Sequence, residues 1–170
     1  MKDKLPASPY TLTELLTRTA KVCVLLSVVT FCLFLFLGMS GYHPKDPGWS
    51  HLGYHPEVSN WTGAAGAWVT DLVFSVLGAA AWLLPPVLLH PVIRFTLYRR
   101  ETVLDSLPFA MLRMVGVIIL LLSISAIASI HLSNSALQYP FTSGGLIGEA
   151  LSDWMVEWFS LLGSSILLVA

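Results

Sequence analysis

The stretch that decides the fold is Val22–Met39, VCVLLSVVTFCLFLFLGM, which begins an uncharged run that extends from Val22 to Pro44. A helix rises about 1.5 Å per residue, so about 20 apolar residues cross the hydrocarbon core of a bilayer. The stretch therefore predicts a membrane-spanning helix. Two further runs, Leu72–Ile93 and Met114–Ile130, are also apolar and uncharged, and they predict a second and a third crossing.

The last residues predict a fourth helix that is cut short. After Glu157 the chain reads WFSLLGSSILLVA and stops at Ala170. These 13 uncharged residues would cross only about 20 Å as a helix, and a chain end inside the bilayer would bury a charged carboxylate. We therefore expect the 170 residues to be a fragment that ends inside the fourth helix.

The composition points to the same class of protein. Of the 170 residues, 55% are hydrophobic and 11% are charged, with a net charge of −1 and a mean hydropathy of +0.74. Soluble domains carry about a quarter charged residues, so a soluble enzyme, a disordered chain and a basic nucleic-acid surface are all disfavoured. Cys23 and Cys32 both lie in an apolar run, which excludes a disulfide framework. We predict an all-α, polytopic membrane protein with a four-helix transmembrane domain.

The positions of Lys and Arg predict how the helices are oriented. Eight cations lie before the first helix or around the loop between the second and third, whereas the loop after the first helix holds only Lys45. Because cytoplasmic loops are enriched in Lys and Arg, we expect a cytoplasmic N-terminus. The predicted segments of this single domain, 1–170, are a cytoplasmic lead-in helix (1–21), the first crossing (22–41), a periplasmic loop (42–62), the second crossing (63–92), a basic cytoplasmic loop (93–110), the third crossing (111–131), a periplasmic segment (132–160) with an amphipathic helix (146–160), and the start of the fourth crossing (161–170).

Two segments outside the crossings carry helix signals of their own. Thr11-Leu-Thr-Glu14 matches a capping box and predicts the start of a juxtamembrane helix. Beyond the glycine-rich turn at 143–148, apolar and acidic residues occupy opposite faces of an amphipathic helix that we expect to lie in the outer interface. A contact between this helix and another protein stays open. The apolar face comprises Ile147, Leu151, Trp154, Met155, Trp158, Phe159 and Leu162, and the polar face Glu149, Ser152, Asp153, Glu157 and Ser160.

The second crossing begins with small residues spaced four apart, which lets another helix approach closely. Asp71 lies on this face, and a carboxylate inside a membrane is a candidate functional group. Its small neighbours and shallow depth favour a hydrogen bond to a nearby helix or loop over ion transport. We expect Pro85, Pro86 and Pro91 to kink or end the helix. The candidate packing residues are Gly63, Gly66, Ala67, Asp71, Ser75 and Gly78, with Gly116 on the third crossing.

The sequence contains none of the common catalytic patterns. It lacks the phosphate-binding G-x-x-x-x-G-K-[ST], the nucleophile G-x-S-x-G, the zinc-binding H-E-x-x-H and the C-x-x-C pair. His51 and His55 have a spacing that binds metals on a helix, but Gly53 and Pro56 disfavour a helix there. We therefore predict no catalytic, cofactor-binding or metal-binding residue in this span.

Several short patterns occur together in one order. The first loop reads P-K-D-P-G-W-S over 44–50, the entry to the second crossing has N-x-x-G-x-x-G-A-W-x-x-D-L over 60–72, and G-G-L-I-G spans 144–148. From Tyr42 to Gly163 this order resembles the N-terminal four-helix membrane domain of the FtsK/SpoIIIE family of bacterial DNA translocases, with Gly48 in place of the usual serine. The loop residues that carry the resemblance are Asp46, Pro47, Trp49, Gly144, Gly145 and Gly148.

The resemblance implies a domain that anchors the protein in the bacterial inner membrane, brings it to the division septum and takes part in assembling the division machinery. Partners of the types FtsZ, FtsQ, FtsL and FtsI are implied, besides the lipid bilayer. A hexameric motor that uses ATP and Mg²⁺ and binds DNA would follow in a missing C-terminal domain. From the residues alone, two other functions stay open: an accessory subunit of a membrane complex, or a small transporter subunit that uses Asp71.

Overall fold

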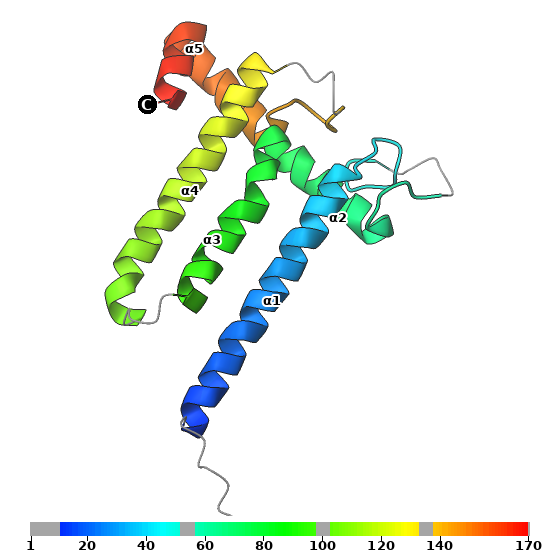
Figure 1. Cartoon of the computed structure of the whole chain (residues 1–170). Coiled ribbons are helices and arrows are strands. Elements are labelled where there is room, and N and C mark those ends of the chain that lie inside the picture. The colour runs from blue at the N-terminus through cyan, green and yellow to red at the C-terminus, as the bar shows by residue number, and fades with distance from the viewer. Residues whose placement is uncertain (1–10, 52–56, 98–102, 133–137, 170) are drawn as a thin grey trace, which may run out of the picture.

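The computed structural model describes residues 11–51, 57–97, 103–132 and 138–169, and every regular element in these ranges is a helix (Figure 1). The all-α prediction is thus confirmed. Three stretches among these residues are long and apolar enough to cross a membrane: Leu12–Ser40, Gly63–Arg94 and Pro108–His131. The elements are α1 (Leu12–Ser40), α2 (Gly63–Leu77), the 3₁₀ helix η1 (Gly78–Leu83), α3 (Leu84–Leu97), α4 (Val103–His131) and α5 (Gly145–Val169).

Helix α1 joins the predicted lead-in helix and the first crossing into one continuous helix of 29 residues. Both bonds of the expected capping box are present: the Glu14 backbone N–H donates to Thr11 Oγ1 (3.4 Å), and the Thr11 N–H donates to Glu14 Oε2 (3.1 Å). At about 1.5 Å per residue the helix is about 43 Å long, so it exceeds the hydrocarbon thickness of about 30 Å by about two turns. It ends where the Gly41 N–H donates to the Leu37 carbonyl.

The second apolar stretch is divided into three pieces. Helix α2 leans away from α3, and η1 joins the two at the top of α3 (Figure 1). The break begins at Gly78, whose φ of +55° strains any residue with a Cβ, and not at a proline as the sequence suggested. Pro85 and Pro86 instead fall in the first turn of α3, where a missing N–H costs no helical hydrogen bond.

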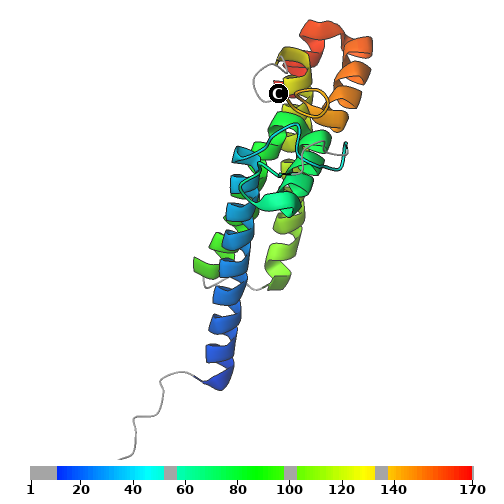
Figure 2. The ribbon, with the colours of Figure 1, turned by 90° about the vertical axis from the view of Figure 1, so that its right-hand side faces the viewer.

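Helix α5 is bent sharply, and α4 lies beside it. Ser160 has a left-handed φ of 59° with ψ of 171°, which breaks α5 into a first arm (145–159) and a second arm (161–169). The second arm turns back toward the end of α4 (Figure 2). Ser152 on the first arm contacts Ser129, and His131 Nε2 lies 2.8 Å from Ser165 Oγ on the second. The two arms therefore enclose the last turns of α4.

The buried core lies at one end of the molecule. We call this the capped end: it holds α2 and η1, the end of α1, the loop residues 41–51 and 57–62, and the segment 138–144 (Figure 1). Phe74 is fully buried there, and its ring centroid lies 5.1 Å from those of both Tyr42 and Tyr139. The opposite, open end holds the end of α3 and the start of α4 (Figure 1). Phe109 and Met114 near that end are 64% and 65% exposed, as expected of side chains that face lipid.

Candidate functional site

The Asp71 carboxylate is the centre of a buried polar cluster at the capped end. It is 1% exposed, and α2 directs it toward the loop that follows α1. The backbone N–H of Ser50 donates to Oδ2 (2.6 Å), while the Ser50 hydroxyl (3.0 Å) and the Tyr42 hydroxyl (3.4 Å) donate to Oδ1. Each oxygen therefore has a donor, which offsets the large cost of removing a carboxylate from water.

Gly48 permits the loop to pass directly over Asp71. A Cβ placed on Gly48 would lie 2.5 Å from Asp71 Cγ, so no side chain fits there while the carboxylate keeps its position. His51 completes the cluster on the loop side. Its Nδ1 lies 2.7 Å from Ser50 Oγ and 3.9 Å from Asp71 Oδ1. The contact with Asp71 becomes an ion pair when the imidazole is protonated.

Tyr42 connects this cluster to the aromatic core. Burial, followed by the nearby negative charge of Asp71, raises the pKa of Tyr42 well above its usual value of 10.0. The hydroxyl consequently stays protonated and remains a donor to Asp71. Its ring packs edge-on against Phe74, so one side chain joins the polar cluster to the apolar core.

A second carboxylate, Asp46, holds the two halves of the same loop together. It is 4% exposed, and its oxygens accept from the backbone N–H groups of Ser59 and Asn60, both at 2.9 Å. The Asn60 side chain continues the connection, because its amide donates to the Gly38 carbonyl on α1 (2.9 Å) and its oxygen accepts from Thr62 N–H (3.0 Å) just before α2. Asp46 and Asn60 thereby fix the loop to both flanking helices.

The glycines predicted near the fourth crossing meet the second crossing at another junction. The Ala79 N–H donates to the Ser143 carbonyl (2.7 Å), and a Cβ on Gly78 would collide with that carbonyl. On the other side, a Cβ on Gly144 or on Gly148 would collide with the Ser125 carbonyl of α4. Small residues thus let three chain segments touch through their backbones.

Ser125 also satisfies a backbone group that the helix break leaves free. Its hydroxyl donates to the carbonyl of Leu77 (3.0 Å), the last residue of α2. In an apolar setting such a carbonyl is costly without a partner. Gly145, with φ of +67°, begins α5 at the same place, so the break in one helix and the start of another share one junction.

The remaining predicted packing residues have different surroundings. Gly66, Ala67 and Ser75 are buried on α2, and a Cβ on Gly66 would collide with the Thr62 side chain. Gly63 has a left-handed φ of +70°, but a Cβ added to it would have no atom within 4 Å. A Cβ added to Gly116 on α4 would also have no atom within 4 Å. Sequence reasoning expected Gly116 to pack on the second crossing, and no described segment lies against it.

The other loop positions are less enclosed. Pro47 is half-buried and Trp49 is exposed, the latter with an indole suited to the headgroup region. His55 lies outside the described residues. Within the described part of the chain, no three His, Cys, Asp or Glu side chains form a group that could hold a metal ion.

Sequence reasoning did not single out Tyr42, Ser50 or Asn60 as partners of the two buried carboxylates. The signal for Asn60 was present, because an Asn side chain in a turn commonly accepts from the backbone N–H two residues further on, here that of Thr62. No comparable signal joined Ser50 to Asp71, which is 21 positions away. Chemically, both carboxylates accept a hydrogen bond at each oxygen, which fixes the loop, whereas the buried Nε2 of His51 has no hydrogen-bond partner among the described residues.

The described part of the chain is all-helical, contains three candidate crossings and buries its polar groups at one end, so it is the membrane domain of a polytopic membrane protein. Residues 17–170 match the family model described as the 4TM region of DNA translocase FtsK/SpoIIIE, and the chain belongs to this family.

Relatives in three genera carry the name DNA translocase FtsK. The protein of Shewanella oneidensis is 31% identical over 138 residues (80% of this chain, 15% of the relative), and that of Pseudomonas putida is 34% identical over 148 residues (86% and 17%). The protein of Vibrio vulnificus is 32% identical over 152 residues (89% and 15%). The chain therefore spans less than a fifth of the length of these relatives. No solved structure matches it.

Proposed function

We propose that this chain is the inner-membrane anchor of a DNA translocase and that it targets the protein to the division septum, where it takes part in assembling the division machinery. The observation that carries the proposal is the family match over 17–170, together with relatives named DNA translocase. The chain corresponds to 15–18% of those relatives. In this proposal ATP hydrolysis, Mg²⁺ and DNA binding, and a hexamer formed through the motor, are assigned to a motor domain outside the matched region.

Localisation of the 170-residue chain tests septum targeting directly. The chain is fused to a fluorescent protein and expressed in a rod-shaped bacterium whose division ring is marked in a second colour. We expect the fusion to concentrate at midcell in constricting cells. A signal spread evenly around the cell envelope would contradict septum targeting, while leaving the membrane location intact.

The proposed orientation has a cytoplasmic N-terminus and a periplasmic capped end, and the bias of Lys and Arg supports it. Glu57 is exposed in the capped loop and Glu14 is exposed at the start of α1. In a chain with Cys23 and Cys32 replaced by alanine, Glu57→Cys should react with a membrane-impermeant maleimide in intact cells. Glu14→Cys should react only after the membrane is permeabilised, and the reverse pattern would invert the topology.

The partners we propose are division proteins of the FtsZ, FtsQ, FtsL and FtsI types, with the lipid bilayer as the medium of the domain. A bacterial two-hybrid assay that pairs the chain with each of the four proteins in turn tests which of them it binds. The matched control is an unrelated polytopic protein of similar expression level. Signals no higher than this control for all four proteins would contradict these partners.

Two alternatives are an accessory subunit of a membrane complex and a transporter subunit that uses Asp71. The transporter is disfavoured because the loop after α1 covers Asp71 and supplies donors to both of its oxygens. Asp71→Asn in the full-length protein should leave ATP turnover intact and impair only assembly or stability. Loss of ATP turnover in a protein that still folds would contradict a pure anchor.

A further inference from the structure

Helix α2 crosses the last turn of α1 and does not run alongside it. A Cβ placed on Gly38, close to the end of α1, would lie 2.9 Å from both Thr62 Oγ1 and Thr70 Cγ2 and 3.8 Å from the Gly66 carbonyl oxygen. Residues 62 to 70 cover about two turns, so two turns of chain at α2 meet a single point of α1. In Figure 1, α2 accordingly runs across the top of α1.

The elements that follow α2 run antiparallel along α1. The ring of Phe36 on α1 packs edge-on against that of Trp82 on η1, with centroids 6.1 Å apart. Further along, Cys32 Sγ lies 3.5 Å from the Pro85 carbonyl oxygen at the start of α3. A step back along α1 thus corresponds to a step forward through η1 and α3, as expected of two neighbouring crossings.

The segment from Gly78 to Arg94 is long enough to cross the bilayer without α2. Its 3₁₀ helix rises about 12 Å and residues 84–94 rise about 17 Å, which together match the hydrocarbon core of about 30 Å. In the antiparallel register, Arg94 in the last turn of α3 falls at about the level of Cys23, close to Lys21 on α1. Cations of both helices therefore mark the same membrane boundary.

The polar cluster around Asp71 fixes the level of α2. Asp71 is near the middle of this helix, and the loop residue Ser50 donates to its Oδ2 (2.6 Å). The same loop exposes the charged side chains of Lys45 and Glu57. An irregular, charged loop cannot enter hydrocarbon. Because this loop covers the middle of α2, the helix lies at the level of the lipid headgroups.

The outward face of α2 is apolar and aromatic. Trp61 and Trp68 are 70% and 47% exposed, and Trp61, Ala65, Trp68 and Leu72 follow one another at spacings of four, three and four residues, which places them on one side. Asp71, the one charged residue of α2, is buried on another side. Tryptophan is enriched at the boundary between headgroups and acyl chains, where its ring is in apolar surroundings and its N–H stays solvated.

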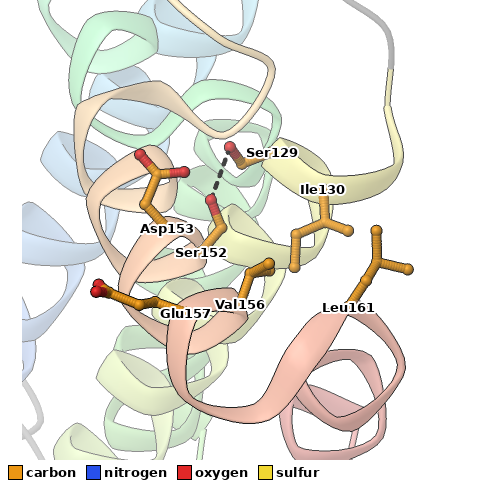
Figure 3. Close-up of a pocket in the computed structure, with 7 residues that line it drawn as sticks. All are labelled: Ser129, Ile130, Ser152, Asp153, Val156, Glu157 and Leu161. Atoms are coloured by element: carbon orange, nitrogen blue, oxygen red, sulfur yellow. Dashed lines mark hydrogen bonds between the residues drawn. The ribbon is translucent and has the colours of Figure 1, made fainter.

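The first arm of α5 lies at the same end of the molecule and also exposes tryptophan. Ser152 joins this arm to Ser129 of α4 (3.1 Å), as Figure 3 shows. Asp153 and Glu157 are exposed, and their carboxylates point away from α4 (Figure 3), so this arm also lies outside the hydrocarbon. Trp158 beside them is 71% exposed.

We propose that the second crossing consists of η1 and α3 alone, and that α2 lies in the membrane interface at the capped end. Trp61 and Trp68 contact the boundary between headgroups and acyl chains of that leaflet. This surface continues onto the lipid-facing side of α1, where Phe36 is 50% exposed. The proposal is independent of septum targeting and of the side of the membrane to which the capped end belongs.

Nitroxide labels on single cysteines measure the depth of α2. The 170-residue chain, with Cys23 and Cys32 replaced by alanine, is reconstituted in phosphatidylcholine liposomes. Trp68→Cys and Leu88→Cys are spin-labelled in separate samples. Collision rates with O₂, which concentrates in hydrocarbon, and with a water-soluble nickel chelate give the depth of each label, and circular dichroism checks that helix content is unchanged.

The two labels separate one continuous crossing from the proposed arrangement. The midpoint of a continuous helix over 63–92 is near Gly78, so both labels would lie about 15 Å from it and at equal depth. In the proposed arrangement the midpoint of the crossing is near Pro86. The ratio of O₂ to nickel collisions should then be several-fold higher at Leu88→Cys than at Trp68→Cys.

A second set of labels measures the direction of α2 and does not require a change of Trp68. Ala65→Cys and Leu72→Cys should have equal collision ratios if α2 lies in the interface. The matched control is Leu112→Cys and Ile119→Cys on α4, which are also seven residues apart, at exposed positions. Their depths should differ by about 10 Å, with the higher O₂ ratio at Ile119→Cys.

Four results would overturn the proposal. Equal ratios at Trp68→Cys and Leu88→Cys, or a step between Ala65→Cys and Leu72→Cys as large as that of the control pair, would make α2 part of the crossing. Low collision rates with both reagents at Trp68→Cys would assign the face to a protein contact. Frequent nickel collisions with few O₂ collisions there would assign it to water.

Discussion

The capped end and the open end of the molecule are held together by different means. At the capped end two carboxylates and an aromatic cluster are buried, with Asp71 1% and Phe74 0% exposed. At the open end the side chains at 108–116 of α4 are exposed, and Gly116 has no neighbour within 4 Å of an added Cβ. Lipid tails solvate apolar side chains as well as another helix does. Close backbone contacts and paired polar groups therefore provide the specific interactions, and this chain places them at one end.

The comparison predicts that substitutions at the capped end are costly and that equivalent substitutions at the open end are tolerated. The glycine junction should show the largest effect. Gly78→Ala would force a Cβ onto a left-handed backbone and against the Ser143 carbonyl. We expect the free energy of unfolding to fall by about 4 kcal/mol, the sum of backbone strain and overpacking.

Titration of the detergent-solubilised chain with sodium dodecyl sulfate, followed by circular dichroism, measures this loss. Ala79→Gly, at the next position, is the control for changes in helix propensity, and it should cost no more than about 1 kcal/mol. Equal effects of the two substitutions would show that the close approach at Gly78 does not determine the stability of the junction.

The buried carboxylate should show the second largest effect. Asp71→Ala removes the acceptor of Ser50 N–H and of two hydroxyl groups, so we expect a loss of about 3 kcal/mol from donors left without a partner. Hydrogen exchange of the Ser50 amide should accelerate in the same variant. Glu57→Gln, at an exposed position of the same loop, should change stability by less than about 0.5 kcal/mol. An unchanged Ser50 exchange rate in Asp71→Ala would contradict the arrangement of the cluster.

Tyr42→Phe should have a smaller effect that depends on pH. It keeps the ring contact with Phe74 and removes one hydrogen bond of 3.4 Å, so we expect a loss of about 1 kcal/mol at neutral pH. The pKa of Tyr42 is raised in the folded chain. The contribution of its protonated hydroxyl is therefore fully present below the unfolded pKa of 10.0 and is lost as the pH rises toward the folded value.

The free energy of unfolding, measured between pH 8 and about 11, tests whether this contribution falls as the pH rises. The parent chain should lose more stability than Tyr42→Phe as the pH passes the ordinary pKa of tyrosine. Parallel curves for the two chains would show that Tyr42 ionises equally easily in the folded and unfolded states.

The open end should give the smallest effect. Gly116→Ala adds a Cβ where the described structure has open space, and alanine is the better helix former. We expect a change between zero and a gain of about 1 kcal/mol in the unfolding titration used for Gly78→Ala. A loss of more than about 1 kcal/mol would mean that another surface, such as a second copy of the chain, packs on α4 at Gly116.

Hydropathy alone was sufficient to find the crossings, because a bilayer requires about 20 apolar residues in a row wherever a helix crosses it. The start of α1 was also predictable, since a capping box acts between residues three positions apart. The break in the second crossing was not predicted correctly. Prolines were expected to cause it, but Pro85 and Pro86 occupy a first turn that tolerates them, and Gly78 adopts the left-handed conformation instead.

By itself, the sequence determined the all-helical class, the three candidate crossings and the membership of Asp71 in a face of small residues, because each of these depends on residues close together along the chain. The tertiary structure decided which groups meet. Ser50 and Tyr42 reach Asp71, and Ser125 reaches Leu77, over separations of 21, 29 and 48 residues. Such contacts depend on how the helices lean and where the loops return. No local pattern encodes that geometry, so only the folded chain shows why one end is packed through polar groups and the other faces lipid.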